Sequence, residues 1–136
     1  MGCRLCELAC LTSHSGHGDL ATAYINDRPA GLSPRRKVVE NGEECVSIGC
    51  RHCDEPLCIS ACISGALIKN AETGITVYEP SLCVGCWACV MACPYGAVRR
   101  NNLENTIIKC DLCTGRENGP ACVEACPNKA LRYEER

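Results

Sequence analysis

The chain has 136 residues with a formal net charge of −2, and it contains 16 cysteines, one tryptophan and no phenylalanine. The absence of a basic patch argues against nucleic-acid binding, and no apolar run in the sequence is long enough to span a bilayer. Nothing resembles a secretory signal, which argues against a secreted disulfide scaffold, and clusters of thiolates need a reducing compartment. We therefore expect a cytoplasmic protein.

Every cysteine except Cys45 belongs to one of four groups along the chain. The groups are Cys3, Cys6 and Cys10; Cys50, Cys53, Cys58 and Cys62; Cys83, Cys86, Cys89 and Cys93; and Cys110, Cys113, Cys122 and Cys126. The third group, followed by Pro94, has the spacing C-x2-C-x2-C-x3-C-P. This is the bacterial ferredoxin signature, in which the fourth cysteine binds the other cluster of a pair. Because a zinc site usually takes two C-x-x-C pairs, the spacing predicts iron–sulfur clusters and leaves a structural zinc protein as an alternative.

The first group resembles the same run with its first cysteine missing. It is followed by residues 11–44, which contain Gly, Pro, Ser and His and no cysteine. Residues 37–40 and 43–48 alternate around Asn41-Gly42, a strong hairpin signal. We expect a flexible surface segment that ends in a small β-ribbon.

The second, third and fourth groups each end in a cysteine that is followed by an alanine and an aliphatic residue a few positions on. After the second group, residues 67–69 and 75–78 are expected to form a hairpin, and after the third group, residues 98–100 and 107–109 are expected to form another. This repetition predicts an α+β fold of tandem, pseudo-twofold bacterial ferredoxin-like modules, with short strands and helical turns around the clusters. With so few bulky side chains, the clusters must act as the core, so the apo chain is not expected to fold.

His52 and Trp87 lie between predicted ligands. Histidine can replace cysteine on iron. The second group already has its full set of cysteines, so we expect a packing or hydrogen-bonding role for His52. Trp87 is expected to fill the core of its half or to shield a cluster from water.

Four motifs then carry a family resemblance: Gly2 to Cys10, Cys50 to Cys58, the ferredoxin run, and Lys109 to Cys113 with Pro120-Ala121-Cys122. In this order they resemble the four-cluster electron-transfer subunits found beside DMSO-reductase type molybdoenzymes, formate dehydrogenases, tungsten aldehyde oxidoreductases, hydrogenases and carbon monoxide dehydrogenases. The resemblance covers nearly the whole chain apart from residues 11–44.

The resemblance implies that the first motif pairs with the fourth and the second with the third. The implied ligand sets are Cys50, Cys53, Cys58 and Cys93; Cys83, Cys86, Cys89 and Cys62; Cys110, Cys113, Cys122 and Cys10; and Cys3, Cys6 and Cys126 with one ligand absent. Residues 1–10 and 110–136 would then form one ferredoxin-like half, residues 50–109 the other, and residues 11–49 an insert with a β-ribbon. The absent ligand is open to three explanations: a cysteine upstream of Met1, Cys45, or a cluster that is open-coordinated or has three irons. If Cys45 binds no cluster, we expect it to be a small buried apolar side chain.

The same resemblance implies an electron relay through up to four 4Fe–4S clusters, between a catalytic oxidoreductase subunit and a redox partner such as a flavoprotein or a ferredoxin. It implies a hetero-oligomer, with a filament as an alternative, and neither nucleic acid nor a membrane span. We find no motif for substrate chemistry, so the chain alone is not expected to be an enzyme. A free-standing polyferredoxin that serves several enzymes is the other alternative.

Overall fold

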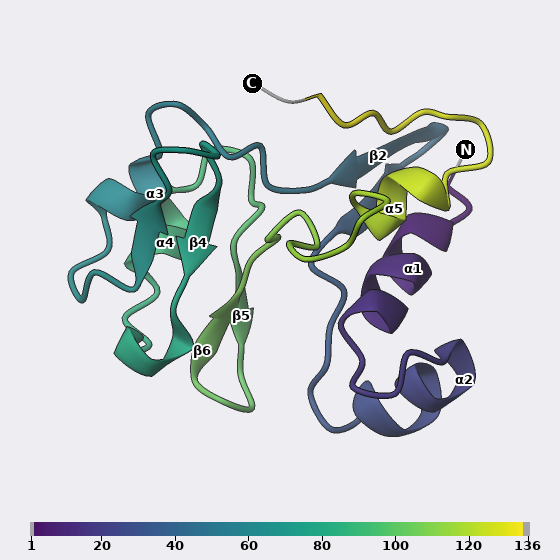
Figure 1. Cartoon of the computed structure of the whole chain (residues 1–136), viewed down its shortest axis with the longest axis horizontal. Helices are drawn as coiled ribbons and strands as arrows, with labels where there is room; N and C mark the ends of the chain where they lie inside the picture. Colours follow the sequence, from purple (N-terminus) through teal and green to yellow (C-terminus); the bar gives the residue numbers. More distant parts are fainter. Residues whose placement is uncertain (1, 135–136) are drawn as a thin grey trace. The chain divides into compact units, whose positions relative to one another are not determined.

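The computed structural model describes residues 2–134 (Figure 1). The chain divides into two compact units, Met1–Ile48 with Leu112–Arg136, here the first unit, and Gly49–Asp111, here the second unit. Within residues 2–134 the strands lie in three antiparallel two-stranded hairpins, and the helices are short. This is a small α+β fold of the ferredoxin-like kind.

The first unit is built on helix α1, which packs against the C-terminal helix α5. Its elements are α1 (Leu5–Ser13), α2 (Leu20–Thr22), the π-helical η1 (Ala23–Asp27), β1 (Lys37–Asn41), β2 (Glu44–Ile48) and α5 (Ala121–Glu124). Cys6, Val38 and Cys122 form its small buried core, with Val123 and Leu131 packed against it. Two of the three buried core residues are therefore cysteines.

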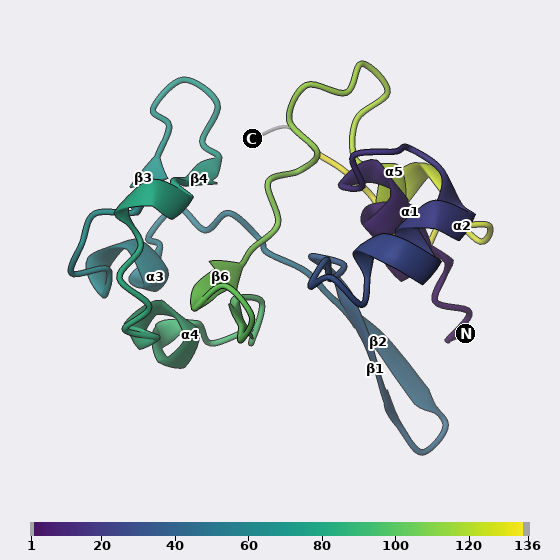
Figure 2. The same ribbon diagram turned by 90° about the horizontal axis from the view of Figure 1, so that it is seen from below.

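The β1–β2 ribbon confirms the hairpin expected from the sequence, with one shift. Figure 2 shows β1 and β2 as one long hairpin. Lys37 pairs with Ile48 and Asn41 pairs with Glu44, so the two-residue loop is Gly42-Glu43 rather than Asn41-Gly42. Gly42 takes a φ of 62° at the first loop position. That position favours glycine in the type II′ turn that suits the twist of a hairpin.

The expectation of a flexible segment before this ribbon was wrong for residues 20–27, which are helical in α2 and η1. Asp19 is the N-cap of α2, because its Oδ2 accepts a hydrogen bond from the N–H of Thr22 at 2.9 Å. An aspartate before a run with apolar residues is an N-cap signal. The Gly, Ser and His residues that precede it concealed that signal in the sequence.

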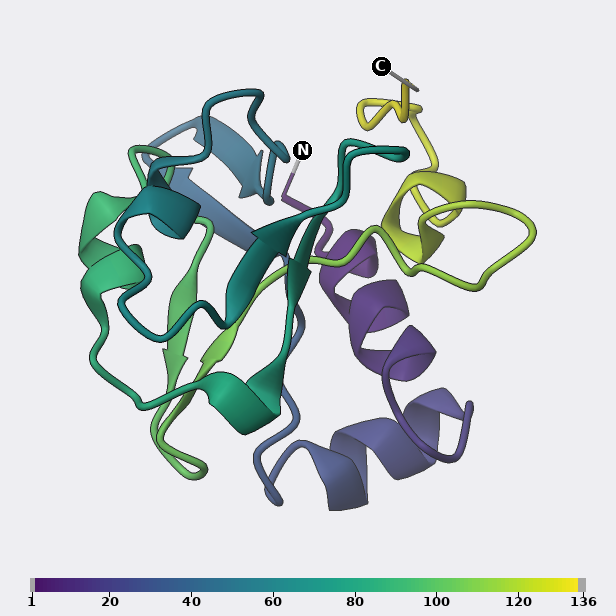
Figure 3. The same ribbon diagram turned by 60° about the vertical axis from the view of Figure 1, so that its left-hand side comes forward.

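The second unit contains two hairpins and two helices. Its elements are α3 (Leu57–Ser60), β3 (Leu67–Lys69), β4 (Thr76–Tyr78), the 3-10 turn η2 (Pro80–Leu82), α4 (Ala88–Ala92), β5 (Arg99–Asn101) and β6 (Thr106–Ile108). β3 pairs with β4 and β5 pairs with β6, which confirms both predicted hairpins. Helix α3 packs against α4 and against β3 (Figure 3).

The core of the second unit is formed by Leu67, Cys89, Val98 and Ile107. Three half-buried cysteines, Cys58, Cys62 and Cys93, pack against it. The cysteine side chains thus occupy the place that large hydrophobic side chains take in an ordinary domain of this size.

Candidate iron–sulfur sites

In the second unit, four thiols line one small cavity. Cys50, Cys53, Cys58 and Cys93 lie around it, and they come from the loop before α3, from α3 itself and from the end of α4. Burial raises the pKa of the Cys58 thiol; Cys50 and Cys93 add to the rise, while the charge of Lys109 opposes it. The structure thus brings together the first of the implied ligand sets.

A second group of thiols gathers around Cys89 on α4. Burial raises the pKa of Cys89 to about 11, and Cys62, Cys86 and Cys83 contribute to the rise. Cys62 comes from just after α3, whereas the other three belong to the ferredoxin run. The structure therefore places the last cysteine of each run near the other run, and the ligand sets themselves stay a prediction.

Three thiols meet in the first unit. Burial raises the pKa of Cys122, Arg36 opposes the rise, and Cys10 and Cys113 add to it. The N–H of Arg35 donates to the Sγ of Cys10 at 3.2 Å. Burial raises the pKa of Cys10, but a hydrogen bond and charge from His14, together with backbone N–H groups, lower the pKa overall. Cys110, the remaining member of this implied set, falls near the end of the second unit, Gly49–Asp111.

The incomplete set consists of Cys3 just before α1, Cys6 in its first turn and Cys126 just after α5. The Sγ of Cys6 lies 3.6 Å from the Oγ of Ser47 on β2. The Sγ of Cys126 donates to the Oδ1 of Asn128 at 3.2 Å. Because α1 packs against α5, the two elements that carry these cysteines are neighbours.

Cys45 lies on β2, two residues before Ser47. A Cβ placed on Gly2 would be 3.0 Å from the Sγ of Cys45 and 3.0 Å from the Oε1 of Glu40. In the sequence Cys45 precedes the second motif, far from Cys3 and Cys6. In the folded chain its thiol lies beside Gly2 of the first motif, and Cys45 stays one of the three explanations for the absent ligand.

His52 and Trp87 are both packed inside the second unit. The Nδ1 of His52 accepts a hydrogen bond from the N–H of Thr76 at 3.0 Å, which confirms the expected hydrogen-bonding role. Burial, and then the charge of Lys109, lower the pKa of His52 to about 4. Trp87 packs against the core, with the guanidinium of Arg100 4.9 Å from its ring centre.

Sequence reasoning missed Thr76 and Lys109, two buried polar residues near the cavity that Cys50 lines. Thr76 is the first residue of β4, and Lys109 directly precedes a predicted ligand. The sequence did place a lysine, Lys109, directly before a cysteine motif, and this was the available signal of a special role. Buried lysines are rare unless they are paired, so the burial of Lys109 is unusual.

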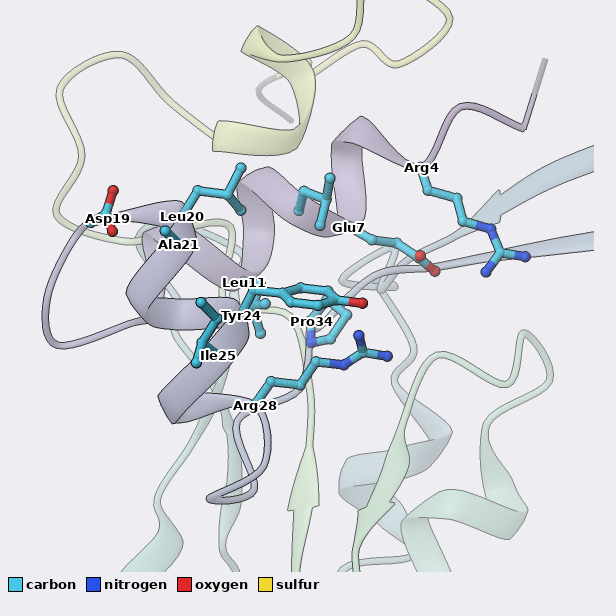
Figure 4. A pocket seen from close by; sticks show the side chains of 11 residues that line it. Arg4, Glu7, Leu11, Asp19, Leu20, Ala21, Tyr24, Ile25, Arg28 and Pro34 are labelled. Carbon is cyan, nitrogen blue, oxygen red and sulfur yellow. The ribbon is translucent and has the colours of Figure 1, made fainter.

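The first unit also contains a cavity of about 790 Å³ (Figure 4). Apolar side chains of α1, α2 and η1 line it, among them Leu11, Leu20 and Tyr24, and Arg28 stacks on the Tyr24 ring at 4.7 Å. Its lining includes no cysteine. The cavity is therefore separate from the thiol sites.

Residues 43–136 match the family model described as a 4Fe-4S dicluster domain. That match covers the ferredoxin run and the thiol sites of the second unit. The chain belongs to the 4Fe-4S dicluster family. At that level it is an iron–sulfur electron-transport protein.

Three relatives from Escherichia coli strain K12 extend the likeness over nearly the whole chain. The electron transport protein HydN is 36% identical over 96% of this chain and 80% of its own length. YnfG, by its name a chain of an anaerobic dimethyl sulfoxide reductase, is 37% identical over 97% of this chain and 67% of its own length. AegA, by its name an oxidoreductase, is 36% identical over 97% of this chain, which spans only 20% of the length of AegA.

Within residues 2–134 we find no helix with the length and apolar character that crossing a membrane requires.

Proposed function

We propose that this protein relays single electrons through up to four 4Fe–4S clusters, between a catalytic oxidoreductase subunit and a redox partner. The donor sets suit the cofactor, because soft thiolate ligands select iron–sulfur clusters. Such clusters supply reversible one-electron chemistry, and the protein sets their position and their surroundings.

The observation that carries the proposal is the exchange of thiols between α3 and α4. Cys58 on α3 lines the first cavity, and Cys62, four residues on and just past the end of α3, lies with Cys89. Cys89 on α4 and Cys93 just past its end are related in the same way. One turn of helix is about 5.4 Å, so two clusters held by these pairs would be close neighbours. Close spacing is what a relay of single electrons needs, and a set of structural zinc sites has no need of it.

The ligand sets in this proposal are those that the resemblance implies. Three sets are complete: Cys50, Cys53, Cys58 and Cys93; Cys83, Cys86, Cys89 and Cys62; and Cys110, Cys113, Cys122 and Cys10. The fourth, with Cys3, Cys6 and Cys126, takes one further ligand. Each ferredoxin-like half would be a pseudo-twofold module built around its own clusters.

The names of the relatives support a partner enzyme, since YnfG is named as a chain of a reductase. For this chain we propose a hetero-oligomer with a molybdenum or tungsten enzyme, a hydrogenase or a carbon monoxide dehydrogenase, with a flavoprotein or a ferredoxin as the other redox partner. The chain itself would carry electrons to or from that enzyme and would contain no substrate site. A reducing compartment such as the cytoplasm would keep its thiolates available.

The name of HydN, an electron transport protein of which this chain covers 80%, favours the second candidate, a free-standing polyferredoxin. The two candidates differ in their assembly. Purification from the native host at a fixed stoichiometry with one large subunit would exclude the free-standing protein. Purification of this protein without any partner subunit would favour it.

The test of the cofactor is an analysis of anaerobically purified protein for iron, acid-labile sulfide and zinc. We expect equal amounts of iron and sulfide, with a visible absorbance that reduction bleaches reversibly. Cys58→Ala should lose one cluster, while Ser60→Ala on the same helix should lose none. A colourless protein that contains zinc would contradict the proposal.

A further inference from the structure

Thr76 is the first residue of β4 and lines the same cavity as Cys50, Cys53, Cys58 and Cys93. Its side chain is 1% exposed, and its Oγ1 has no hydrogen-bond partner among the described residues. A buried hydroxyl without a partner is costly, so such a group in a folded protein calls for an explanation. A sulfur atom of a cluster bound in this cavity would be the missing acceptor.

The backbone of Thr76 is held on both sides by side chains. Its N–H donates to the Nδ1 of His52 at 3.0 Å, and its carbonyl oxygen accepts from the Nζ of Lys109 at 2.8 Å. The partners in these bonds, His52 and Lys109, are 24 and 33 positions away from Thr76 in the sequence. Because a β-branched side chain is also restricted at χ1, they fix where the hydroxyl can point.

The hydrogen bond also defines the state of the His52 ring. An N–H can only donate, so the Nδ1 of His52 must be unprotonated, and the neutral ring carries its proton on Nε2. That Nε2 is likewise buried without a partner among residues 2–134. His52 therefore acts on Thr76 as a fixed acceptor and brings no charge of its own.

Lys109 brings a buried positive charge to the same place. It is 4% exposed, and its Nζ donates to the carbonyl oxygens of Thr76 and Cys110 at 2.8 and 3.0 Å. Its charge reaches Cys58, where it opposes the effect of burial on the thiol. A buried ammonium needs negative charge nearby, and cluster-bound thiolates would supply it.

We propose that the Thr76 hydroxyl donates a hydrogen bond to a sulfur of the cluster bound by Cys50, Cys53, Cys58 and Cys93, and thereby raises the reduction potential of that cluster. His52 and Lys109 are positioning residues that hold Thr76 in place. The inference rests on the proposed function. Reduction would add to a cluster held by these cysteines one electron, supplied by the redox partner, and with it one negative charge. A hydrogen-bond donor stabilises the more negative state more strongly, so removing the donor lowers the potential.

The test compares Thr76→Val, which has nearly the same shape and no hydroxyl, with Thr76→Ser, which keeps the hydroxyl. Each holoprotein is titrated anaerobically against potential, with the reduced clusters followed by electron paramagnetic resonance. The step that belongs to this cluster is the one that Cys58→Ala removes. Thr106→Val on β6, which does not line the cavity, is the matched control.

We expect Thr76→Val to shift the ratio of reduced to oxidised cluster about tenfold at a fixed potential, which is about 59 mV for a one-electron couple. Thr76→Ser should restore the wild-type value, and Thr106→Val should not change it. Iron content should be the same in all these proteins. Thr76→Ala also lacks the hydroxyl and cannot clash, so it must show the same drop if Thr76→Val fails to load its cluster.

A wild-type potential in a loaded Thr76→Val or Thr76→Ala protein would overturn the inference and leave the proposed function standing. Wild-type protein without iron and acid-labile sulfide would instead overturn the proposed function. The two failures are therefore distinguishable in one set of samples.

Discussion

Gly85 in the ferredoxin run lies directly against Asn105 in the turn between β5 and β6. A Cβ placed on Gly85 would be 2.6 Å from the carbonyl oxygen of Asn105 and 2.5 Å from its Nδ2. Gly85 also has a φ of 68°, in the region where side chains are disfavoured. The loop that carries Cys83 and Cys86 is therefore packed against this turn without room for a side chain.

We expect Gly85→Ala to weaken the site around Cys89 much more than Gly96→Ala does. Gly96 has a similar φ of 60°, but a Cβ there would meet nothing within 4 Å. Both changes place a side chain at a positive φ, which destabilises the folded protein by about 1–2 kcal/mol. Only Gly85→Ala also overpacks its surroundings, which destabilises the protein by about 1–3 kcal/mol more. The measurement is the rate at which a chelator removes iron from each holoprotein. Equal rates for the two variants would show that the contact with Asn105 is unimportant.

The carboxylate of Glu7 links α1 to the β-ribbon, because its Oε1 accepts the N–H of Val38 at 2.6 Å. We expect Glu7→Ala to destabilise the first unit by about 1–3 kcal/mol, since it leaves a backbone donor without a partner. Glu7→Gln keeps an acceptor oxygen and should be much milder. Denaturant titration of the holoproteins, followed by the loss of visible absorbance, measures both; a Glu7→Gln protein as unstable as Glu7→Ala would contradict this account of the link.

Cys45 beside Gly2 offers a test of the incomplete ligand set. In the three complete sets that we propose, three ligands come from one motif and the fourth is the last cysteine of the paired motif, a pattern that Cys45 does not follow. We therefore expect Cys45→Ala to keep as many clusters as the wild type. Iron and sulfide analysis decides the matter, and the loss of one iron or of a whole cluster would make Cys45 the missing ligand.

Removal of the clusters is expected to unfold the chain. Both cores contain cysteines, and few large side chains are buried beside them. Because ligand binding supplies the folding free energy in small domains of this kind, the apo chain should lose its helix signal in circular dichroism. An apo protein with a cooperative thermal transition would contradict this.

Much of the fold could be predicted because its signals are local. Alternating residues around a turn gave the β3–β4 and β5–β6 hairpins, and cysteine spacing gave the groups of thiols. The helix over residues 20–27 was missed because one capping aspartate, Asp19, was the main signal among turn-forming residues. Local sequence also could not place Cys45 beside Gly2, since that contact depends on how the β1–β2 ribbon packs against the first motif.

The surroundings of Thr76 could not be predicted for the same reason. His52 and Lys109 reach it from 24 and 33 residues away, and neither bond follows from spacing within a motif. In the sequence Thr76 is an ordinary strand residue, and only its burial with an unpaired hydroxyl sets it apart.

The central claim is that the four cysteine groups bind 4Fe–4S clusters and that the protein uses them to carry electrons. Native mass spectrometry of anaerobically purified protein, with the denatured mass taken in parallel, tests it most directly. We expect a difference between the two masses that equals four 4Fe–4S clusters, or three together with a three-iron cluster if the fourth set lacks a ligand. A difference that equals zinc ions alone, or no difference at all, would contradict the account.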